Sequence, residues 1–355
     1  MSRRPKSRGG SLSAGRRLAI MLGSAGATLA LVGVLFAAWV VWSYQGPGPK
    51  AESGEVTTVM LRRGAGVTEI ASTLERAGVI GSSAIFVAAA QLTGAGTSLK
   101  AGEYEFPSRA SMARIMADIR DGKVVRHQIT IPEGMTSKAA AEALAGIPEL
   151  TGVAPEPPEG AILPETYQFE RGEDRAAVLK RMMDARDELL AQLWRARQPG
   201  LPITSPEEAV ILASIVEKET GIAEERPRVA AVFVNRLRQG MKLESDPTII
   251  YGLTGGKPLG RGLRASEMAQ PNPYNTYQIP RLPPGPIANP GREALAAVLD
   301  PPQTTDLFFV ADGTGGHVFA QTYEQHLKNV AQWRAIERQR DAAALQDEAA
   351  ALKKR

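Results

Sequence analysis

Two glutamates at the end of an apolar segment are the residues of this sequence best suited to chemistry. Residues 209–216 read AVILASIV, and Glu217 and Glu219 follow closely. A helix with this pattern is buried on most sides, and its dipole disfavours anions at its C-terminal end. Low dielectric and the dipole both raise the pKa of a carboxyl group, which suits a general acid that works near neutral pH.

Helical geometry separates the two carboxylates. At roughly 100° per residue, Glu219 lies in line with the apolar residues three, four and seven positions before it, whereas Glu217 points about 160° away. The pair therefore cannot flank one glycosidic bond from this helix, as the two carboxylates of a sugar hydrolase do. Glu219 is the predicted acid. The alternative is that both glutamates only pair with neighbouring cations, namely Lys218, Arg226, Arg228 and Arg236.

A proline-rich segment later in the chain carries candidate sugar-binding side chains. Residues 269–291 contain seven prolines and two glycines, which exclude regular structure and predict a stiff loop. Aromatic faces and amide side chains suit sugars, which present apolar ring faces and hydroxyl groups. The alternative is that the tyrosines only seal the loop against the body. The four residues at the centre of the loop are Tyr274, Asn275, Thr276 and Tyr277.

Helix signals frame the apolar segment. Residues 205–208, SPEE, match an N-cap, a proline at the first helical position and a capping box, and Gly221 is the expected C-cap. A second helix is expected through residues 229–237, with Gly240 as its end. Glycines 313, 315 and 316 predict a hairpin turn, which His317 is expected to stabilise.

About 75 residues on the N-terminal side of these helices combine strand patterns with helical patterns, which is typical of a small α+β unit. Residues 148–160 follow it and hold four prolines and three glutamates, so the chain there is expected to be extended and solvated and to mark the border with a second domain. The larger second domain is predicted to be mainly helical. In the small unit, strands are expected at residues 57–61, 102–106 and 126–131, and helices from residue 67 to Gly78, at 83–92 and at 111–120.

The N-terminus predicts a membrane anchor. Residues 1–17 carry six cations and no acid, and residues 18–42 hold no charge at all. As a helix, 25 residues span roughly 37 Å, enough to cross a hydrocarbon core of about 30 Å. The positive-inside rule places the basic tail in the cytoplasm and all that follows outside it, anchored in the inner (plasma) membrane. A polar linker, residues 43–54, comes next. The alternative is a buried core helix.

Composition excludes several classes of function. The chain has no cysteine and three histidines, so thiolate nucleophiles, disulfides and histidine metal centres are not expected, and no cofactor-binding motif is present. The formal net charge is +4. Because the first 17 residues supply six positive charges, the remaining 338 residues have a formal charge of −2, which gives no support for a nucleic-acid partner.

Four separated segments resemble one known family. In order along the chain, the sequence is similar to the YceG-like (MltG) family of membrane-anchored endolytic murein transglycosylases, over about residues 56–335. A further element, residues 159–169, resembles the family pattern, although residues 161–163 (AIL) replace its aromatics, which removes the sugar stacking expected there. The four segments are ASIVEKETG (213–221), VFVNRLRQGMKLESDPTIIYGL (232–253), NPYNTYQIPRLPPGPIANPG (272–291) and LFFVADGTGGHVF (307–319).

The resemblance implies a reaction. The family's catalytic acid/base maps onto Glu219, the residue that the helical stripe also indicates. It implies cleavage of the β-1,4 bond between N-acetylmuramic acid and N-acetylglucosamine, by attack of the muramyl C6 hydroxyl on C1, which leaves a 1,6-anhydro end. Such a lyase needs no water, no second carboxylate, no metal and no cofactor. The expected further substrate contacts are Asn235, Asp246 and Thr248, although Asp246 is alternatively only a helix N-cap.

The resemblance also implies an organisation. The expected parts are a basic cytoplasmic tail (1–17), a transmembrane helix (18–42), a linker (43–54), a LysM-like subdomain (55–132), a catalytic domain (133–335) and a charged helical tail (336–355). The expected partners are peptidoglycan glycan strands and membrane-bound peptidoglycan synthases, with termination of strand elongation as the role. The alternative is a non-catalytic, membrane-tethered scaffold that binds peptidoglycan.

Overall fold

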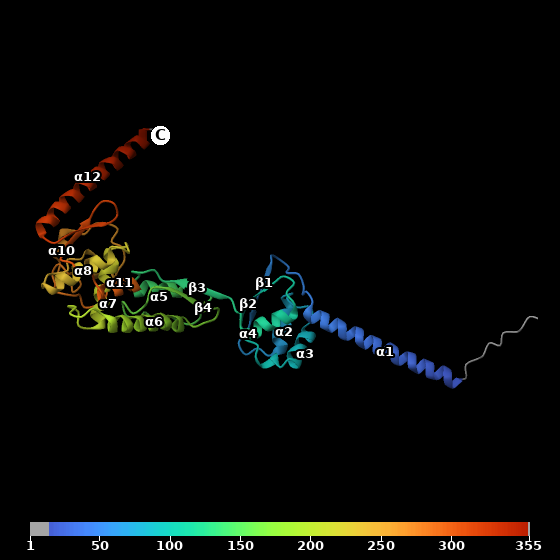
Figure 1. The fold of residues 1–355 in the computed structure, drawn as a ribbon. Helices are drawn as coiled ribbons and strands as arrows, with labels where there is room; N and C mark the ends of the chain where they lie inside the picture. The colour runs from blue at the N-terminus through green and yellow to red at the C-terminus, as the bar shows by residue number, and fades with distance from the viewer. Residues whose placement is uncertain (1–13, 354–355) are drawn as a thin grey trace, which may run out of the picture. The chain divides into compact units, whose positions relative to one another are not determined.

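The computed structural model describes residues 14–353 and divides into two compact units, Met1–Arg126 and His127–Arg355 (Figure 1). Helices dominate, and the strands of the described chain form three two-stranded sheets. The chain is thus of the mixed α+β class, as predicted. Most of the predicted basic tail, residues 1–17, lies outside the described residues, as do the last two residues of the predicted C-terminal tail.

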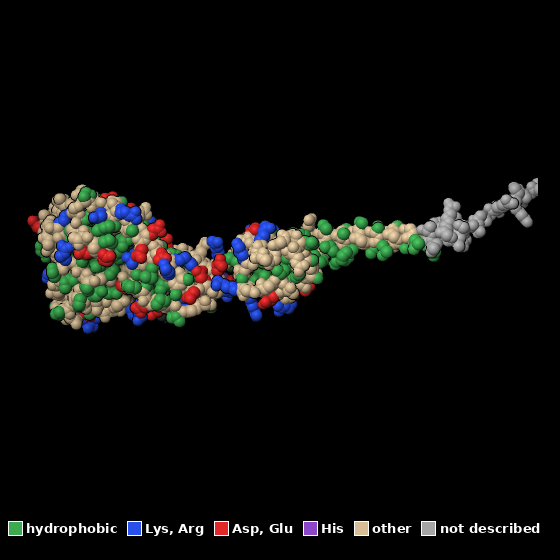
Figure 2. All heavy atoms as spheres, turned by 90° about the horizontal axis from the view of Figure 1, so that it is seen from below, with side chains coloured by type: hydrophobic (Ala, Val, Ile, Leu, Met, Phe, Trp, Pro, Cys, Tyr) green, Lys and Arg blue, Asp and Glu red, His purple; other side chains and the backbone are tan. Residues whose placement is uncertain are grey.

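Helix α1, Ala14–Gln45, opens the first unit. Its segment Met21–Gln45 is 25 residues long with a mean hydropathy of 2.0, so it is long and apolar enough to cross a membrane. Its large apolar side chains are exposed, as the hydrophobic atoms along this helix in Figure 2 show. These features make α1 a candidate membrane span and exclude a buried core helix, because none of this apolar window is buried.

The rest of the first unit contains the predicted elements to within about two residues, except the strand expected at 126–131, which pairs with β4 (Thr166–Glu170) of the second unit. Strands β1 and β2 pair antiparallel, from Val56 opposite Pro107 to Leu61 opposite Gly102. Their inward residues Tyr104 and Phe106 pack against the helices in a common core. The elements are β1 (Val56–Leu61), α2 (Val67–Arg76), α3 (Ser83–Leu92), η1 (Ala95–Thr97), β2 (Gly102–Pro107) and α4 (Met112–Asp121).

The second unit begins with a small sheet and two helices. Strand β3 pairs with β4, and helix α6 packs beside them around a core that includes Ile131, Leu144, Ile162 and Met182. Residues 148–160 contain no helix, as predicted, but they lie inside the second unit, which begins at His127, and do not mark its border. The elements are β3 (Arg126–Thr130), α5 (Ser137–Ala145), β4 (Thr166–Glu170) and α6 (Arg175–Ala196).

Helix α7, Pro206–Glu219, forms the centre of the second unit, and residues 209–216 are all buried. It packs against α6, α8 and α11. The Ser205 hydroxyl accepts from the backbone N–H of Glu208, as an N-cap does. The capping box is incomplete, because the Glu208 carboxylate accepts from Thr204.

The prediction that Gly221 caps α7 is wrong. The C-cap is Thr220, whose backbone is extended (φ −142°, ψ 134°). The Thr220 hydroxyl accepts from the Ile222 N–H, so the chain leaves the helix without a left-handed residue. Gly240 does follow the end of α8 with φ +66°, a conformation that favours glycine.

Among the remaining elements, α8, α9 and α11 pack against α7, and a hairpin and a long helix follow α11 in the chain. Residues 270–291 are irregular, as predicted, whereas the helix α9 was not predicted. Strands β5 and β6 form the expected hairpin, with Phe308 opposite Ala320. The elements are α8 (Arg226–Arg238), α9 (Asp246–Thr254), α10 (Ala265–Ala269), α11 (Arg292–Leu299), β5 (Phe308–Ala311), β6 (His317–Ala320) and α12 (Tyr323–Lys353).

Candidate active site

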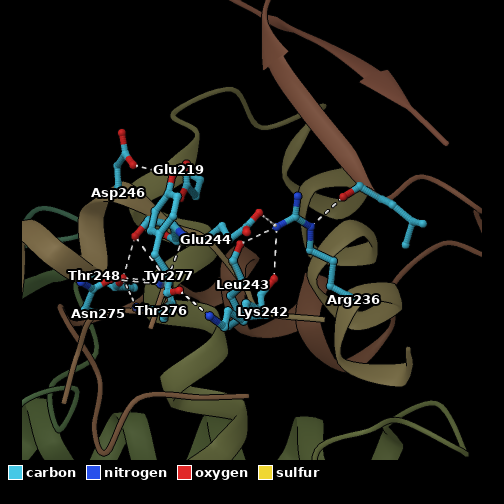
Figure 3. Close-up of polar contacts among 12 residues, drawn as sticks. Glu219, Arg236, Lys242, Leu243, Glu244, Asp246, Thr248, Asn275, Thr276 and Tyr277 are labelled. Carbon is cyan, nitrogen blue, oxygen red and sulfur yellow. Dashed lines mark hydrogen bonds and ion pairs between the residues drawn. The ribbon is translucent and has the colours of Figure 1, made fainter. Parts of the chain in front are cut away.

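Glu219 is the last residue of α7 (Figure 3) and is partly buried. One carboxylate oxygen, Oε1, accepts a hydrogen bond from the Ser245 hydroxyl. Burial raises the pKa of Glu219 to about 7, although the Ser245 hydrogen bond opposes this effect; the Asp246 charge adds to the rise. A carboxyl group with this pKa is protonated in a large fraction of molecules near neutral pH, as a general acid must be.

Glu217 has a different environment. Its side chain is 5% exposed, and its Oε2 accepts from the backbone N–H of Gly291 at 2.8 Å. The Arg226 guanidinium lies 3.6 Å from Oε1. The alternative that the glutamate only pairs with a neighbouring cation therefore holds for Glu217, whose partner is Arg226. Within residues 14–353, Glu219 forms no ion pair with any of the predicted cations.

Arg236 fixes the conformation of the turn that precedes Ser245. The guanidinium Nη1 donates to the carbonyls of Leu243 (2.9 Å) and Lys242 (3.2 Å), and Nε donates to the carbonyl of Leu307 (2.7 Å). Glu244, within this turn, has a positive φ of 52° and also pairs with Arg236. The buried arginine therefore holds a strained turn in place. The sequence analysis did not predict this role of Arg236, although a cation among the buried apolar residues of α8 indicates that its charge must have partners in the fold.

Three of the predicted substrate-binding residues meet at the same place but are fully buried. The Thr276 hydroxyl accepts from the Ser245 N–H at 2.9 Å and lies 2.9 Å from the Thr248 hydroxyl, which donates to the Ser245 carbonyl at 2.6 Å. The Asn275 amide donates to the carbonyls of Met268, in α10, and of Gln270, and its oxygen accepts from the Tyr277 N–H. This network fixes Ser245, the hydrogen-bond partner of Glu219, and the loop backbone at Tyr277.

Tyr277 and Asp246 are the predicted contacts that reach the surface next to Glu219. The Tyr277 hydroxyl donates to Asp246 Oδ1 at 2.8 Å, and Figure 3 shows the Tyr277 ring beside Glu219. Burial, together with the Asp246 charge, raises the pKa of Tyr277, so the phenol stays protonated. The N-cap of α9 is Ser245, so Asp246 is not a cap and is free to point outward.

Tyr274 and Asn235 have other contacts. The Tyr274 ring packs against that of Tyr251, with centroids 4.9 Å apart. The Asn235 amide donates to the carbonyls of Thr304 (2.9 Å) and Asp306 (3.1 Å), and so holds the segment that leads into β5. Neither residue shares a described hydrogen bond with the group around Glu219.

His317 joins the hairpin to the start of α8. The Glu225 carboxylate accepts from the backbone N–H of His317 at 2.9 Å and contacts its Nδ1 at 2.8 Å. The turn itself is held by the Asp312 carboxylate, which accepts from the N–H groups of Thr314 and Gly316. His317 thus fixes the hairpin to α8 and does not hold its turn, and Glu225 is a partner that sequence reasoning missed. The charge of His317 lowers the pKa of Glu219, so the hairpin also influences the site.

Comparison with known proteins gives consistent matches. The model of the YceG-like family matches residues 59–332. An endolytic murein transglycosylase of Streptococcus pneumoniae D39 is 29% identical over 332 residues, which cover 79% of this chain and 59% of that protein. One of Bacillus subtilis is 28% identical over 309 residues, which cover 78% of this chain and 84% of that protein.

The chain thus spans about 59% of the length of the pneumococcal relative. A crystal structure of a YceG-like protein from Listeria monocytogenes is 30% identical and matches with a TM-score of 0.47. That match covers 78% of this chain and 99% of the Listeria chain.

Proposed function

The chain belongs to the YceG-like family, and from this premise we propose that it is an endolytic murein transglycosylase, a lyase that acts on peptidoglycan. The proposed substrate is the glycan strand, cut at the β-1,4 bond between N-acetylmuramic acid and N-acetylglucosamine. The observation that carries the proposal is Glu219: one carboxyl group, at the end of a buried helix, with a pKa raised to about 7.

In the proposed mechanism, Glu219 acts first as acid and then as base. Protonated Glu219 donates its proton to the glycosidic oxygen, and the bond between that oxygen and C1 of the muramyl residue breaks. The C6 hydroxyl of the same residue attacks C1, and the Glu219 carboxylate accepts the hydroxyl proton. The products are a 1,6-anhydromuramyl end and a free 4-hydroxyl on N-acetylglucosamine. Because the nucleophile belongs to the substrate, one carboxylate is sufficient.

The neighbouring residues have proposed supporting roles. Ser245 orients the Glu219 carboxylate by its hydrogen bond. Tyr277 and Asp246, which reach the surface beside Glu219, contact the sugars, and Tyr274 extends this surface along the loop. The buried residues of the predicted set act as positioning residues: Asn235, Thr248, Asn275 and Thr276.

The location and the first unit complete the proposal. We place α1 across the inner membrane with the basic tail in the cytoplasm, and the linker, the rest of the first unit and the second unit on the periplasmic side. The order strand, helix, helix, strand in β1 to β2 supports a LysM-like subdomain. An anchored enzyme meets glycan strands close to the membrane, where synthases make them, so we propose that it terminates nascent strands beside those synthases.

The deciding experiment is digestion of purified sacculi by the full chain in detergent, with mass spectrometry of the products. Anhydro-muropeptides are expected with the wild type and with Glu224→Gln, an exposed glutamate close by in the chain, but not with Glu219→Gln. Reducing ends in place of anhydro ends would mean that water is the nucleophile. Equal products from the wild type and Glu219→Gln would contradict the assignment of the acid, and no products from any variant would favour the non-catalytic scaffold.

A further inference from the structure

A pocket lies next to the candidate site along α7 and α9. It has a volume of about 320 Å³, and α7, α9 and the loop after α9 contribute to its walls. Apolar side chains, including Ile250 and the ring of Tyr251, line it, and three cations stand around it: Lys218, Lys257 and Arg261. None of the described hydrogen bonds of Glu219, Ser245 or Tyr277 involves these residues, so the pocket is separate from the site described above.

The pocket adjoins the candidate site on two elements. Lys218 precedes Glu219 in α7, and Pro247, which also lines the pocket, follows Asp246 in α9. Consecutive Cα atoms are about 3.8 Å apart, and consecutive side chains of a helix point about 100° apart. The pocket and Glu219 thus lie on adjoining faces of α7.

The charge around the pocket is positive. The Arg261 guanidinium is held by both carboxylate oxygens of Glu267, which balances its charge. Lys218 donates to the carbonyl of Gly134 at 3.4 Å, and the Glu217 carboxylate acts on its charge without forming an ion pair. Lys257 is exposed, and among residues 14–353 neither lysine forms an ion pair. Lys257 is therefore the cation of the pocket that is available to an anionic ligand, and Lys218 is partly compensated.

The backbone sets the position of Lys257. Gly255 and Gly256, directly before it, have φ values of +65° and +88°, which favour glycine. A Cβ on Gly256 would lie 2.3 Å from the Thr136 side chain, so the loop can approach this closely only without a side chain. The backbone conformation of this loop therefore fixes the position of Lys257 at the edge of the pocket.

We propose that this pocket binds the stem peptide of the muramyl residue that is cut, with its carboxylates on Lys218 and Lys257 and its alanine methyl groups against Ile250 and Tyr251. This inference rests on the proposed function. The stem peptide is attached through the lactyl group on C3 of the same muramyl ring whose C1 and C6 hydroxyl react, so it must leave the ring within a few ångströms of Glu219. The chain therefore prefers peptide-substituted strands over naked ones.

The diphosphate of a lipid-linked strand is the other anion that two lysines could bind. In an endolytic cut, that diphosphate lies whole sugar units away from the cleaved bond, whereas the stem peptide is attached to the reacting ring itself. The position of the pocket next to Glu219 therefore favours the peptide.

The first test is binding to the full chain in detergent that carries Glu219→Gln, so that the ligand stays intact. Calorimetry compares glycan oligomers that carry stem peptides with the same oligomers stripped by an amidase. Substituted oligomers are expected to bind about tenfold more tightly, and amidation of the peptide carboxylates is expected to abolish the difference. Adding Lys257→Glu, or the milder Lys257→Met, is expected to reduce the preference to about twofold or less. Lys180→Glu, an exposed lysine on α6, is the matched control and should retain it.

Equal binding of naked and substituted oligomers to Glu219→Gln would overturn the inference, as would a preference that survives Lys257→Glu and Lys257→Met. Inorganic diphosphate that binds in a Lys257-dependent manner, with no preference for the peptide, would assign the pocket to lipid-linked strands instead. The ratio of kcat/KM on substituted and naked strands, measured without the Glu219 substitution, is expected to fall by the same factor in Lys257→Glu. If the wild type binds with the preference but releases no anhydro ends, the proposed function fails while the peptide site stands.

Discussion

Glu219 and Glu217 are two residues apart on one helix, and burial raises the pKa of both. Their polar contacts differ. Glu217 receives a backbone N–H and lies beside a guanidinium, so its position is determined by structure on all sides. Glu219 receives one hydroxyl and, within residues 14–353, forms no ion pair. Glu219 is therefore the carboxyl group with fewer partners in the protein, as expected of a group that gives its proton to a substrate.

Replacing Ser245 with alanine tests how the pKa of Glu219 is set. The Ser245 hydrogen bond stabilises the carboxylate and lowers the pKa, so its loss raises the pKa further. Because the general acid must be protonated, activity falls on the alkaline side as Glu219 ionises. In Ser245→Ala, we expect this alkaline limb of the kcat/KM profile to move to higher pH by about one unit, since a hydrogen bond to a charged group is worth roughly 1.5–3 kcal/mol and one unit is about 1.4 kcal/mol.

Ser245 makes no side-chain cap on α9, so the substitution does not remove a helix cap. Ser72→Ala, at an exposed site of α2, serves as the control and should leave the profile unchanged. A limb that stays in place or moves to lower pH would contradict the role given to Ser245.

At the scale of elements, one buried hydroxyl connects α7 to the proline-rich loop. The Ser214 hydroxyl donates to the carbonyl of Ile211 at 2.7 Å, one turn earlier, and accepts from the backbone N–H of Ile287 at 3.0 Å. Ser214 is the single polar residue in AVILASIV. This contact explains why a polar residue stands inside an otherwise apolar helix: the backbone N–H of Ile287, in the proline-rich loop, uses the Ser214 hydroxyl as its hydrogen-bond acceptor.

Substitution of Ser214 by alanine measures the strength of this connection. The Ile287 N–H would be left buried without an acceptor, which costs about 1–3 kcal/mol. We expect the free energy of unfolding of the second unit to fall by that amount in urea, followed by the fluorescence of Trp194, which packs against the same core. Ser72→Ala, on the surface of the first unit, should change it by less than about 0.5 kcal/mol. A Ser214→Ala chain as stable as the wild type would mean that the loop is held by other contacts.

At the scale of the whole molecule, the apolar helix α1 lies in the sequence between a short basic tail and the residues from the linker onward. The absence of cysteine allows the orientation to be tested with single introduced thiols. In intact spheroplasts, a membrane-impermeant maleimide is expected to label Ser53→Cys in the linker, and to label Ser11→Cys in the tail only after the membrane is permeabilised. The reverse pattern would place both units in the cytoplasm, away from peptidoglycan, and would contradict the proposed function.

Several elements could be predicted because their signals are local. The strands and helices of the first unit follow from alternation and helical spacing, and the hairpin follows from three glycines. Helix α9 was missed because DPTIIYGLT is rich in residues with modest helix propensity. Its formation depends on packing against α7, which no local pattern reveals. Gly221 was misassigned because Thr220 ends α7 in an extended conformation.

The sequence by itself determined the candidate anchor, the order of the elements and the position of Glu219 on the apolar face of its helix, because each depends on residues within a few turns of one another. Only the tertiary structure distinguishes Glu217, which is held by a backbone N–H and a guanidinium, from Glu219, which has one hydroxyl partner. The partners that make this distinction are Ser245, 26 residues from Glu219, and Gly291, 74 residues from Glu217. Hydrogen bonds over such separations form only when the chain has folded, because packing of distant segments brings their atoms together.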